Sequence, residues 1–401
     1  MTKSHSPNRR HFLQGSALAA GAAMFGSMPF INRGLAAGEP VRIGIALDQT
    51  GRASVFGIPG TNTARMVTEQ INAAGGILGR PMELFIADTA TDESTGVANV
   101  RTMLQRDRVD VVIGGLSSSM RKAIKSVIVD RNKTLYMYPT LYEGGECTPY
   151  LYSTGATPAQ QCEMLIPWMI EQGAKRFAVP GSDYLWPQVM AKRVREAVES
   201  RGGEIVFEEL YPFDQVDFSA AVNRIISAKA DVVINNVVPP GAGPLVKQLH
   251  QSGFHAGGGR IGSFYYDENA LNLNSTEEME GVVSCLDWFQ VLADKDPFSK
   301  SVLDDYTKMF PGKFTFTAGN SSVSVYRCMK LYAAAVEKAG SVDRDAVAAA
   351  LETVQVEAPG GTSSFVPGKR HLAMNMYLAE CRNGRFEIAT QSNGPIIPQE
   401  C

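Results

Sequence analysis

The sequence lacks the cysteine and histidine patterns on which metal binding and redox chemistry depend. Its six cysteines form no CxxC pair and no Cys/His cluster, which argues against a zinc site or a dithiol centre. We therefore expect no metal and no cofactor. In an oxidising compartment a disulfide between Cys147 and Cys162 stays open as an alternative to buried thiols. The cysteines are residues 147, 162, 285, 328, 381 and 401.

Histidines are also scarce, and none of them completes a catalytic set. The three that follow residue 37 are His250, His255 and His371, which we expect to be solvent-exposed. A nucleophile needs a base within hydrogen-bond reach, so we expect the protein not to be an enzyme. The alternative is an amide hydrolase, although the two glycines within its set indicate a turn. That set would be Lys133, Glu143, Glu146 and Cys147.

No block of five like charges occurs, and the chain carries 38 basic against 41 acidic residues. Nucleic-acid binding needs concentrated Lys and Arg, so we exclude it. There is no low-complexity tract either, and 44% of the residues are hydrophobic, as in a folded protein. A chain of 401 residues is too long for one ordinary core and predicts two domains.

The first 37 residues differ from the rest of the chain. Arg9 and Arg10 precede a weakly apolar stretch at 14–31, and small residues follow at 34–37. This arrangement resembles a twin-arginine export signal and predicts cleavage near Ala37, which places the mature protein in the periplasm. A membrane anchor is the alternative, but three glycines and Pro29 interrupt the stretch, so we expect no membrane-spanning segment in the mature chain.

From residue 41 onward, short apolar strands alternate with amphipathic helices. This alternation predicts an α/β fold with parallel sheets covered by helices on both faces. Strands are expected at 42–47, 83–87, 109–113 and 134–138, and helices at 61–73, 96–105 and 120–130. In the last third we expect helices at 321–339 and 343–354, and a closing hairpin of 374–381 with 385–390 around Asn383 and Gly384.

The second half of the chain repeats the first. Glu-Ile-Val at 204–206 follows Glu-Leu-Phe at 83–85 by 121 residues, and Asp-Val-Val-Ile recurs at 110–113 and 231–234 with the same offset. We therefore expect two similar doubly wound parallel-sheet lobes with a ligand cleft between them. Lobe 1 would comprise residues 38–157 plus about 287–360, and lobe 2 residues 158–286 plus about 361–401.

Hydroxyl, amide and aromatic side chains follow most of the expected strands. In a parallel sheet, ligands bind beyond the carboxyl ends of the strands, so these residues predict a site for a small polar ligand held between aromatic walls. Helix capping by the serines and simple packing of Tyr184 and Trp186 are the alternatives. The residues at these strand ends include Ser117, Ser118, Tyr138, Thr140, Tyr184, Trp186, Asn236, Tyr266 and Asp267.

Residues 72–80, Asn-Ala-Ala-Gly-Gly-Ile-Leu-Gly-Arg, resemble a turn of the type I periplasmic ligand-binding proteins, the leucine/isoleucine/valine-binding group. Within that group the strongest similarity is to urea and short-chain amide binders. It rests on the motifs at 121–123, 138–144, 156–160 and 181–187. The resemblance implies a solute-binding protein that delivers a small amide or urea to the membrane permease of an ABC importer.

Carried over onto this chain, the amide contacts of that group fall on five of the strand-end residues: Ser118, Tyr138, Thr140, Tyr184 and Trp186. The chain departs from the pattern at Trp186, where these binders usually have Tyr or Phe. It also departs at 235–236 and 239–240, which do not match well. A larger indole changes the volume of the pocket, so the ligand need not be urea or acetamide.

Other functions remain open at this point. A branched-chain amino-acid binder would need an anchor for an ammonium group, for which Asp267 or Glu268 is available. A small cation held by aromatic faces is also conceivable. A cytoplasmic ligand-responsive regulator fits less well, because it would lack an export signal.

Overall fold

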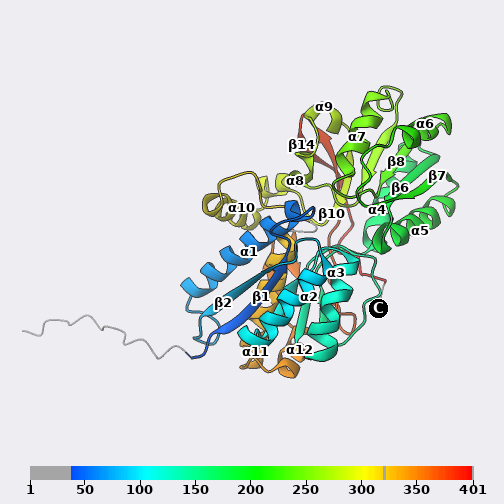
Figure 1. Cartoon of the computed structure of the whole chain (residues 1–401). Coiled ribbons are helices and arrows are strands. Elements are labelled where there is room, and N and C mark those ends of the chain that lie inside the picture. Colours follow the sequence, from blue (N-terminus) through cyan, green and yellow to red (C-terminus); the bar gives the residue numbers. More distant parts are fainter. Residues whose placement is uncertain (1–37, 319–321, 400–401) are drawn as a thin grey trace, which may run out of the picture. The chain divides into compact units, whose positions relative to one another are not determined.

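The computed structural model describes residues 38–318 and 322–399. The described residues belong to one compact unit. The predicted export signal lies outside the described residues. Within them, the chain builds two mostly parallel sheets wrapped by helices, which confirms the predicted α/β class with two lobes (Figure 1).

The first sheet has five parallel strands in the order β2-β1-β3-β4-β5. Successive residues of a strand point to opposite faces, and both faces here are buried. Val111 and Ile113 pack into one apolar cluster while Val112 packs into another. This double burial explains why the central strand β3 is apolar throughout, whereas the edge strand β2 carries the exposed Glu83. Their bounds are Val41–Leu47 (β1), Met82–Asp88 (β2), Val111–Gly114 (β3), Leu135–Tyr138 (β4) and Leu151–Ser153 (β5).

Helices from both ends of the chain cover this sheet. α1 and α11, which lie far apart in the sequence, pack together on one face, and α2 and α3 supply side chains to the cluster on the other. The bounds are Ser54–Ala73 (α1), Glu93–Thr102 (α2), Ser118–Lys125 (α3), Ser322–Ala339 (α11) and Arg344–Leu351 (α12). The helix expected at 120–130 thus begins two residues earlier, and it continues as a π-helix at Ser126–Arg131.

The second sheet has seven strands in the order β14-β13-β10-β9-β8-β6-β7, of which β13 and β14 run antiparallel. The predicted closing hairpin is confirmed, with Asn383 and Gly384 both at positive φ as its two-residue turn requires. The strand bounds are Arg176–Ser182 (β6), Glu204–Tyr211 (β7), Val232–Asn235 (β8), Arg260–Ser263 (β9), Val283–Leu286 (β10), Tyr377–Arg382 (β13) and Arg385–Gln391 (β14).

The helices that accompany the second sheet include four long ones and two of a single turn. α4 and α5 pack against each other, as do α6 and α7. The bounds are Pro158–Glu171 (α4), Leu185–Glu199 (α5), Ser219–Ser227 (α6), Ala242–Gln251 (α7), Glu268–Leu271 (α8) and Thr276–Met279 (α9).

The repeat seen in the sequence corresponds to equivalent places in the two sheets. β2 and β7 are the outer parallel strands, and β3 and β8 lie on the other side of β1 and β6. The repeated aspartates make the same contact. Asp110 accepts a hydrogen bond from the backbone N–H of Arg42 at 2.8 Å, and Asp231 accepts one from that of Arg176 at 2.8 Å. Each aspartate joins two neighbouring strands at their amino ends.

The chain passes between the two sheets three times, after β5, after β10 and before β13. The segment between β10 and α11 holds α10 (Pro297–Met309), and a small hairpin of β11 (Val356–Ala358) and β12 (Gly361–Ser363) follows α12. His371 then pairs with Ser153 at the edge of the first sheet, and Phe365 packs on Tyr152 at 5.0 Å. We therefore propose that the last crossing lies between residues 372 and 377 rather than near 361.

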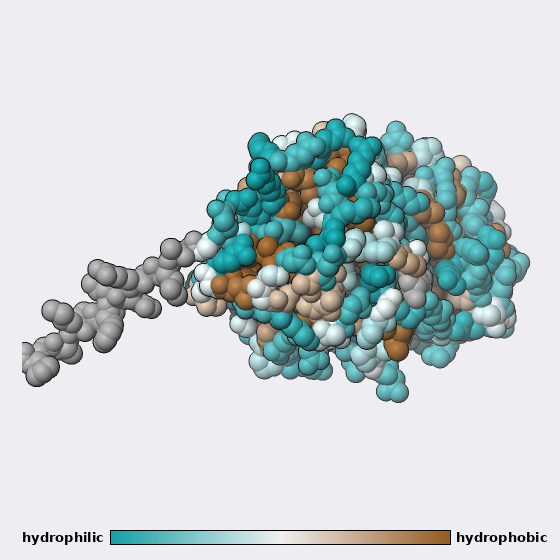
Figure 2. Space-filling model, turned by 90° about the horizontal axis from the view of Figure 1, so that it is seen from below, coloured by the Kyte–Doolittle hydropathy of each residue, from teal (hydrophilic) through white to brown (hydrophobic). Residues whose placement is uncertain are grey.

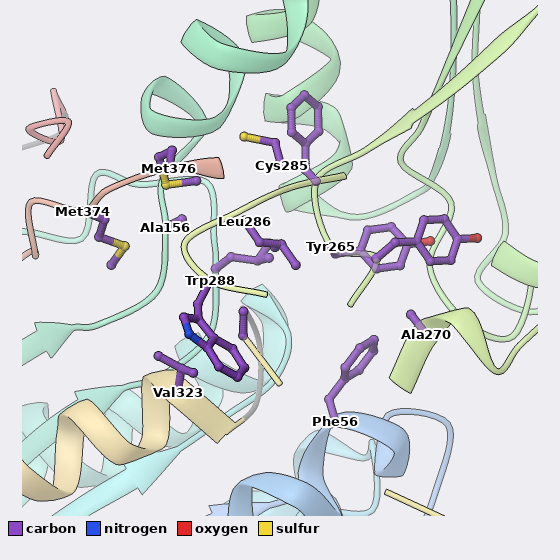
Figure 3. Close-up of a cluster of buried hydrophobic side chains, with 14 of the residues drawn as sticks. Phe56, Ala156, Tyr265, Ala270, Cys285, Leu286, Trp288, Val323, Met374 and Met376 are labelled. Atoms are coloured by element: carbon purple, nitrogen blue, oxygen red, sulfur yellow. The ribbon is translucent and has the colours of Figure 1, made fainter. Parts of the chain in front are cut away.

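Apolar side chains fill the space where these crossings meet. Figure 3 shows Trp288, which follows β10, beside Val323 of α11, and Phe56 of α1 directed toward Ala270 and Tyr265. The outside is different, because hydrophilic residues dominate the face drawn in Figure 2, with several apolar patches between them. None of the described helices is long and apolar enough to span a bilayer.

Candidate functional site

A pocket lies where the carboxyl ends of strands from both sheets face each other. Six of the nine predicted site residues line it: Ser117, Ser118, Tyr138, Thr140, Tyr184 and Trp186. Its volume is about 60 Å³. One water needs about 10–15 Å³ on this measure, so the pocket has room for a small molecule.

Two hydroxyl groups of the first lobe line the pocket and are nearly inaccessible to solvent. The Ser118 hydroxyl donates to a carboxylate oxygen of Glu143 at 2.7 Å, and the Thr140 hydroxyl donates to the Gly115 carbonyl at 2.8 Å. Ser117, beside them, caps α3 by accepting a hydrogen bond from the Met120 N–H at 3.1 Å. Ser117 therefore has the capping role that the sequence offered as an alternative, while it also lines the pocket.

A buried ion pair stands behind this wall. Arg121 and Glu143 meet at 2.5 Å, with side chains only 2% and 6% exposed. The Arg121 guanidinium also lies over the rings of Tyr138 and Tyr142, at 5.1 and 4.6 Å from their centroids. The pair and the rings hold β4 and the loop after it against α3. Burial raises the pKa of Tyr138 to about 12, so its phenol is neutral at physiological pH.

Asp48 is a lining residue that we did not predict from the sequence. It directly follows β1, is 2% exposed, and accepts hydrogen bonds from the hydroxyls of Thr89 and Thr91. Burial raises the pKa of its carboxyl, and those two hydroxyls oppose the shift. The signal was present in the sequence, because Asp48 occupies a strand end like the predicted residues.

The second lobe contributes mainly aromatic rings. Tyr184 precedes α5 and Trp186 lies in its first turn. Trp186 packs edge-on against Tyr265 with centroids 6.1 Å apart, and Tyr184 lies 5.6 Å from Phe213. The Trp186 side chain is buried, and its indole N–H has no hydrogen-bond partner among the described residues. Burial raises the pKa of Tyr184 as well, which keeps that hydroxyl protonated.

The remaining lining residues also escaped prediction. Arg52 is exposed and lies over the Phe213 ring at 4.4 Å. Most of the others are apolar and carry no signal that separates them from ordinary core residues. They are Ala53, Phe56, Leu116, Met120, Leu141, Phe213, Val238, Pro239 and Tyr265, with Thr91 as a polar member.

Three predicted residues do not line the pocket. Asn236 is buried at the end of β8, where its backbone pairs with the end of β6. The Tyr266 ring stacks on Tyr265, and its hydroxyl meets the Asn235 amide at 3.3 Å. Asp267 caps the short helix α8 by accepting from the Ala270 N–H at 2.8 Å. Position at a strand end did not decide which side chain turns toward the pocket.

Glu268, the other acid considered as an anchor, is also directed elsewhere. It accepts a hydrogen bond from the Gln290 N–H at 2.7 Å. Burial raises the pKa of Asp267 to about 6 and that of Glu268 to about 8, because the charged form of a carboxyl is disfavoured away from water.

One expectation about an individual residue is wrong, and one open alternative is decided. His371, expected at the surface, is buried and stacks on the Tyr142 ring, with its Nε2 at the tyrosine hydroxyl. Cys162 is a buried thiol on α4, which excludes a bridge to Cys147. In the part of the chain that the structure describes, no group of three or more His, Cys, Asp or Glu side chains could hold a metal ion.

Comparison with known proteins places this site in context. A sequence model of the family described as "Periplasmic binding protein" matches residues 40–385. A Leu/Ile/Val-binding protein of Rhizobium johnstonii is 28% identical over 78% of this chain and 83% of its own. A leucine-, isoleucine-, valine-, threonine- and alanine-binding protein of Pseudomonas aeruginosa is 27% identical over 82% of this chain and 86% of its own.

Solved structures agree on the fold. A solute-binding protein of an ABC transporter from Rhodopseudomonas palustris, in complex with p-hydroxybenzoic acid, superposes with a TM-score of 0.80 at 20% identity, covering 89% of this chain and 98% of its own. The leucine-binding protein LivK of Thermotoga maritima gives 0.76 at 20% identity, covering 88% and 99%. The chain therefore belongs to the periplasmic binding protein family and is a binding protein, not an enzyme.

Proposed function

We propose that the chain captures a small amino acid with an apolar side chain in this pocket and delivers it to the permease of an ABC importer. The observation that carries the proposal is the composition of the pocket. A buried carboxylate, hydroxyl groups and aromatic rings surround a space closed between two sheets. Such a lining suits a ligand with one polar end and one apolar end.

The relatives favour an amino acid over the urea or short-chain amide that the sequence motifs suggested. Both curated relatives named above are called binding proteins for leucine, isoleucine and valine. The amide prediction rested on the motifs at 121–123, 138–144, 156–160 and 181–187, and residues from three of these motifs line or support the pocket. They are compatible with either ligand, because hydroxyls and rings bind amides and amino acids alike.

An amino acid needs a partner for its ammonium group. Asp48 is the carboxylate that lines the pocket, whereas Asp267 and Glu268 do not. A bound ammonium would favour the charged form of Asp48 and offset the effect of burial on its pKa. We assign the anchor to Asp48. The apolar side chain of the ligand would lie against Phe56, Leu116 or Val238.

A thermal-shift screen tests the proposal directly. A ligand that binds only the folded state raises the melting temperature, by an amount that grows with its concentration over Kd. We expect leucine, isoleucine, valine or alanine to raise it by several degrees and Asp48→Asn to abolish the shift. If urea or acetamide stabilises the protein and no amino acid does, the ligand is an amide instead.

Location and partner follow from the family. Membership implies a periplasmic location and a membrane permease as partner. We propose that export uses the twin-arginine route with cleavage near Ala37. Substitution of Arg9 and Arg10 by Lys would then retain an uncleaved protein in the cytoplasm, which immunoblotting of cell fractions detects. Continued processing of that variant would contradict the route but leave the binding proposal intact.

A further inference from the structure

We propose that a disulfide joins Cys147 to Cys401 and fastens the segment after β14 to the loop between β4 and β5. The sulfur of Cys147 is bonded in a disulfide. Cys401 lies outside the described residues and is the one cysteine of the sequence left as its partner, because the other four are buried thiols. These thiols are Cys162, Cys285, Cys328 and Cys381. The inference stands apart from the proposed function, since it does not depend on the ligand.

Exposure separates Cys147 from the other described cysteines. It lies in the loop between β4 and β5 and is exposed, whereas the four thiols are buried. A disulfide forms by attack of a thiolate, so its sulfur must be within reach of an oxidant. Among the described cysteines, only Cys147 meets this condition.

The backbone on both sides of Cys147 is held in place. The carboxylate of Glu146 forms an ion pair with Lys125 of α3 at 3.0 Å, and the Arg370 side chain donates to the Cys147 carbonyl at 3.3 Å. A disulfide tolerates only a narrow range of Cα separations, about 4.4–6.8 Å. A loop that is already fixed presents its sulfur at a constant position, which favours the bond.

The segment after β14 is held against the same crossing between the lobes. Ile396 exchanges two backbone hydrogen bonds with Met374, at 2.7 and 3.2 Å, and its carbonyl also accepts from the Gln160 side-chain amide at 2.9 Å. The crossing that carries Met374 begins near Arg370, which contacts Cys147. The loop and the segment after β14 therefore lie against one short stretch of chain.

The lengths of the chain segments allow the bond. Arg370 and Met374 are separated by four residues, which span at most about 14 Å. Ile396 and Cys401 are separated by five residues, which span up to about 18 Å. The segment beyond Ile396 is thus long enough to reach from its attachment at Met374 to the loop of Cys147.

Formation of the bond is a two-electron oxidation. The two thiols lose two protons and two electrons, and a disulfide-bonded donor protein accepts them by exchange through a mixed disulfide. Family membership implies a periplasmic location, and the periplasm is an oxidising compartment. The bond adds a covalent link between the lobes to the three peptide crossings, and it holds the loop that carries Glu143 behind the pocket.

Counting of thiols tests the bond, in protein isolated from the periplasm and unfolded without reductant. Wild type should show four thiols among its six cysteines. Cys401→Ala should show five, because Cys147 is released, whereas the control Cys381→Ala should show three. Five or six thiols in wild type would overturn the proposal, and three in Cys401→Ala would do so too, because the bond would then join other cysteines.

Tryptic digestion without reduction identifies the two partners. The expected product joins peptide 134–175 to peptide 386–401, with a mass two hydrogens below the sum of both. Peptide 134–175 also contains Cys162, which lines a surface pocket together with Gln399. The joined product should therefore persist in Cys162→Ala and disappear in Cys147→Ala. The opposite pattern would overturn the assignment to Cys147.

Melting temperatures measure the effect of the bond on the fold. A disulfide that closes a long loop stabilises the folded state by restricting the unfolded chain. Cys401→Ala should melt about 5 °C below wild type, and reductant should lower wild type by the same amount without affecting this variant. Reductant should also lower the control Cys381→Ala. Equal melting temperatures of wild type with and without reductant would contradict the fastening.

Discussion

Glu143 carries the buried ion pair behind the pocket. In the sequence it stood among residues that could have formed a hydrolase, but its carboxylate contacts Arg121 at 2.5 Å and receives the Ser118 proton. Both oxygens are therefore used within the protein. A buried pair of this kind is costly to break, because one charge is then left without a partner.

Replacement of Glu143 by Ala should lower the free energy of unfolding by about 3–5 kcal/mol, because Arg121 stays buried without a counter-charge. Asp304→Ala is the matched control, since it breaks an exposed ion pair. The side chains of that pair are 60% exposed in Lys300 and 61% exposed in Asp304. That change should be within about 0.5 kcal/mol of wild type. Urea unfolding measures both, and equal losses in the two variants would contradict the role of burial.

Glu268 should make stability depend on pH. Its pKa is raised from 4.5 to about 8 in the folded protein, so the folded state binds the proton more tightly than the unfolded state between those values. Stability therefore falls as pH rises through this window. Glu268→Gln should reduce the fall between pH 5 and pH 8 by on the order of 1–3 kcal/mol. If the free energies of unfolding of the variant and of wild type changed with pH in the same way, the pKa of Glu268 would not be raised in the folded protein.

The start of α1 positions one side of the pocket. The sequence predicted a helix only from residue 61, because glycines and Pro59 precede it, yet α1 begins at Ser54. The reason is tertiary. Gly57 packs so closely on the end of β1 that a Cβ there would lie 1.9 Å from the Asp48 carbonyl oxygen. This contact places Asp48 and Phe56 together in the lining.

Gly57→Ala should therefore destabilise the protein, although alanine normally favours a helix over glycine. Overpacking against the Asp48 backbone should cost about 1–3 kcal/mol and weaken ligand binding, because Asp48 must move. Gly312→Ala, at a position with no atom within 4 Å, is the control and should be neutral. Thermal unfolding measures the loss of stability, and calorimetric titration with leucine measures the loss of affinity. A more stable Gly57→Ala protein would refute the packing argument.

At the scale of the whole molecule, residues of both lobes line the pocket, and a cation–π contact connects the two lobes beside it. Arg52, which precedes α1 of the first lobe, lies over Phe213, which follows β7 of the second, at 4.4 Å. Solute-binding proteins with two lobes close around their ligands by hinge motion. A contact that exists only between the lobes should favour the closed form, and thereby ligand affinity, more than it favours folding.

Arg52→Ala should weaken ligand binding by about two- to fivefold, the value of an exposed cation–π contact, and leave the unfolding free energy unchanged. Arg260→Ala is the control, because Arg260 lies over Trp168 at 5.8 Å with both residues in the second lobe. Calorimetric titration should show normal affinity for that variant. Equal affinities of the two variants would mean that the contact across the pocket does not favour closure.

Prediction from the sequence succeeded where a local pattern carries the information. The turn at Asn383 and Gly384 and the repeated strands beginning at Glu83 and Glu204 were correctly predicted, because φ preference and apolar periodicity are local properties. Side-chain direction is not local. Tyr265 lines the pocket and Tyr266 does not, although they are neighbours of the same residue type.

Composition and periodicity were enough to predict an α/β protein with two parallel-sheet lobes and a polar, aromatic site at the strand ends. They were enough because burial on both faces requires continuously apolar strands. Only the folded chain brings Arg52 and Phe213 to that site, removes Asp267 from it and buries His371. These outcomes depend on contacts between residues far apart in the sequence, such as that of Gly57 with the end of β1, and no local pattern encodes them.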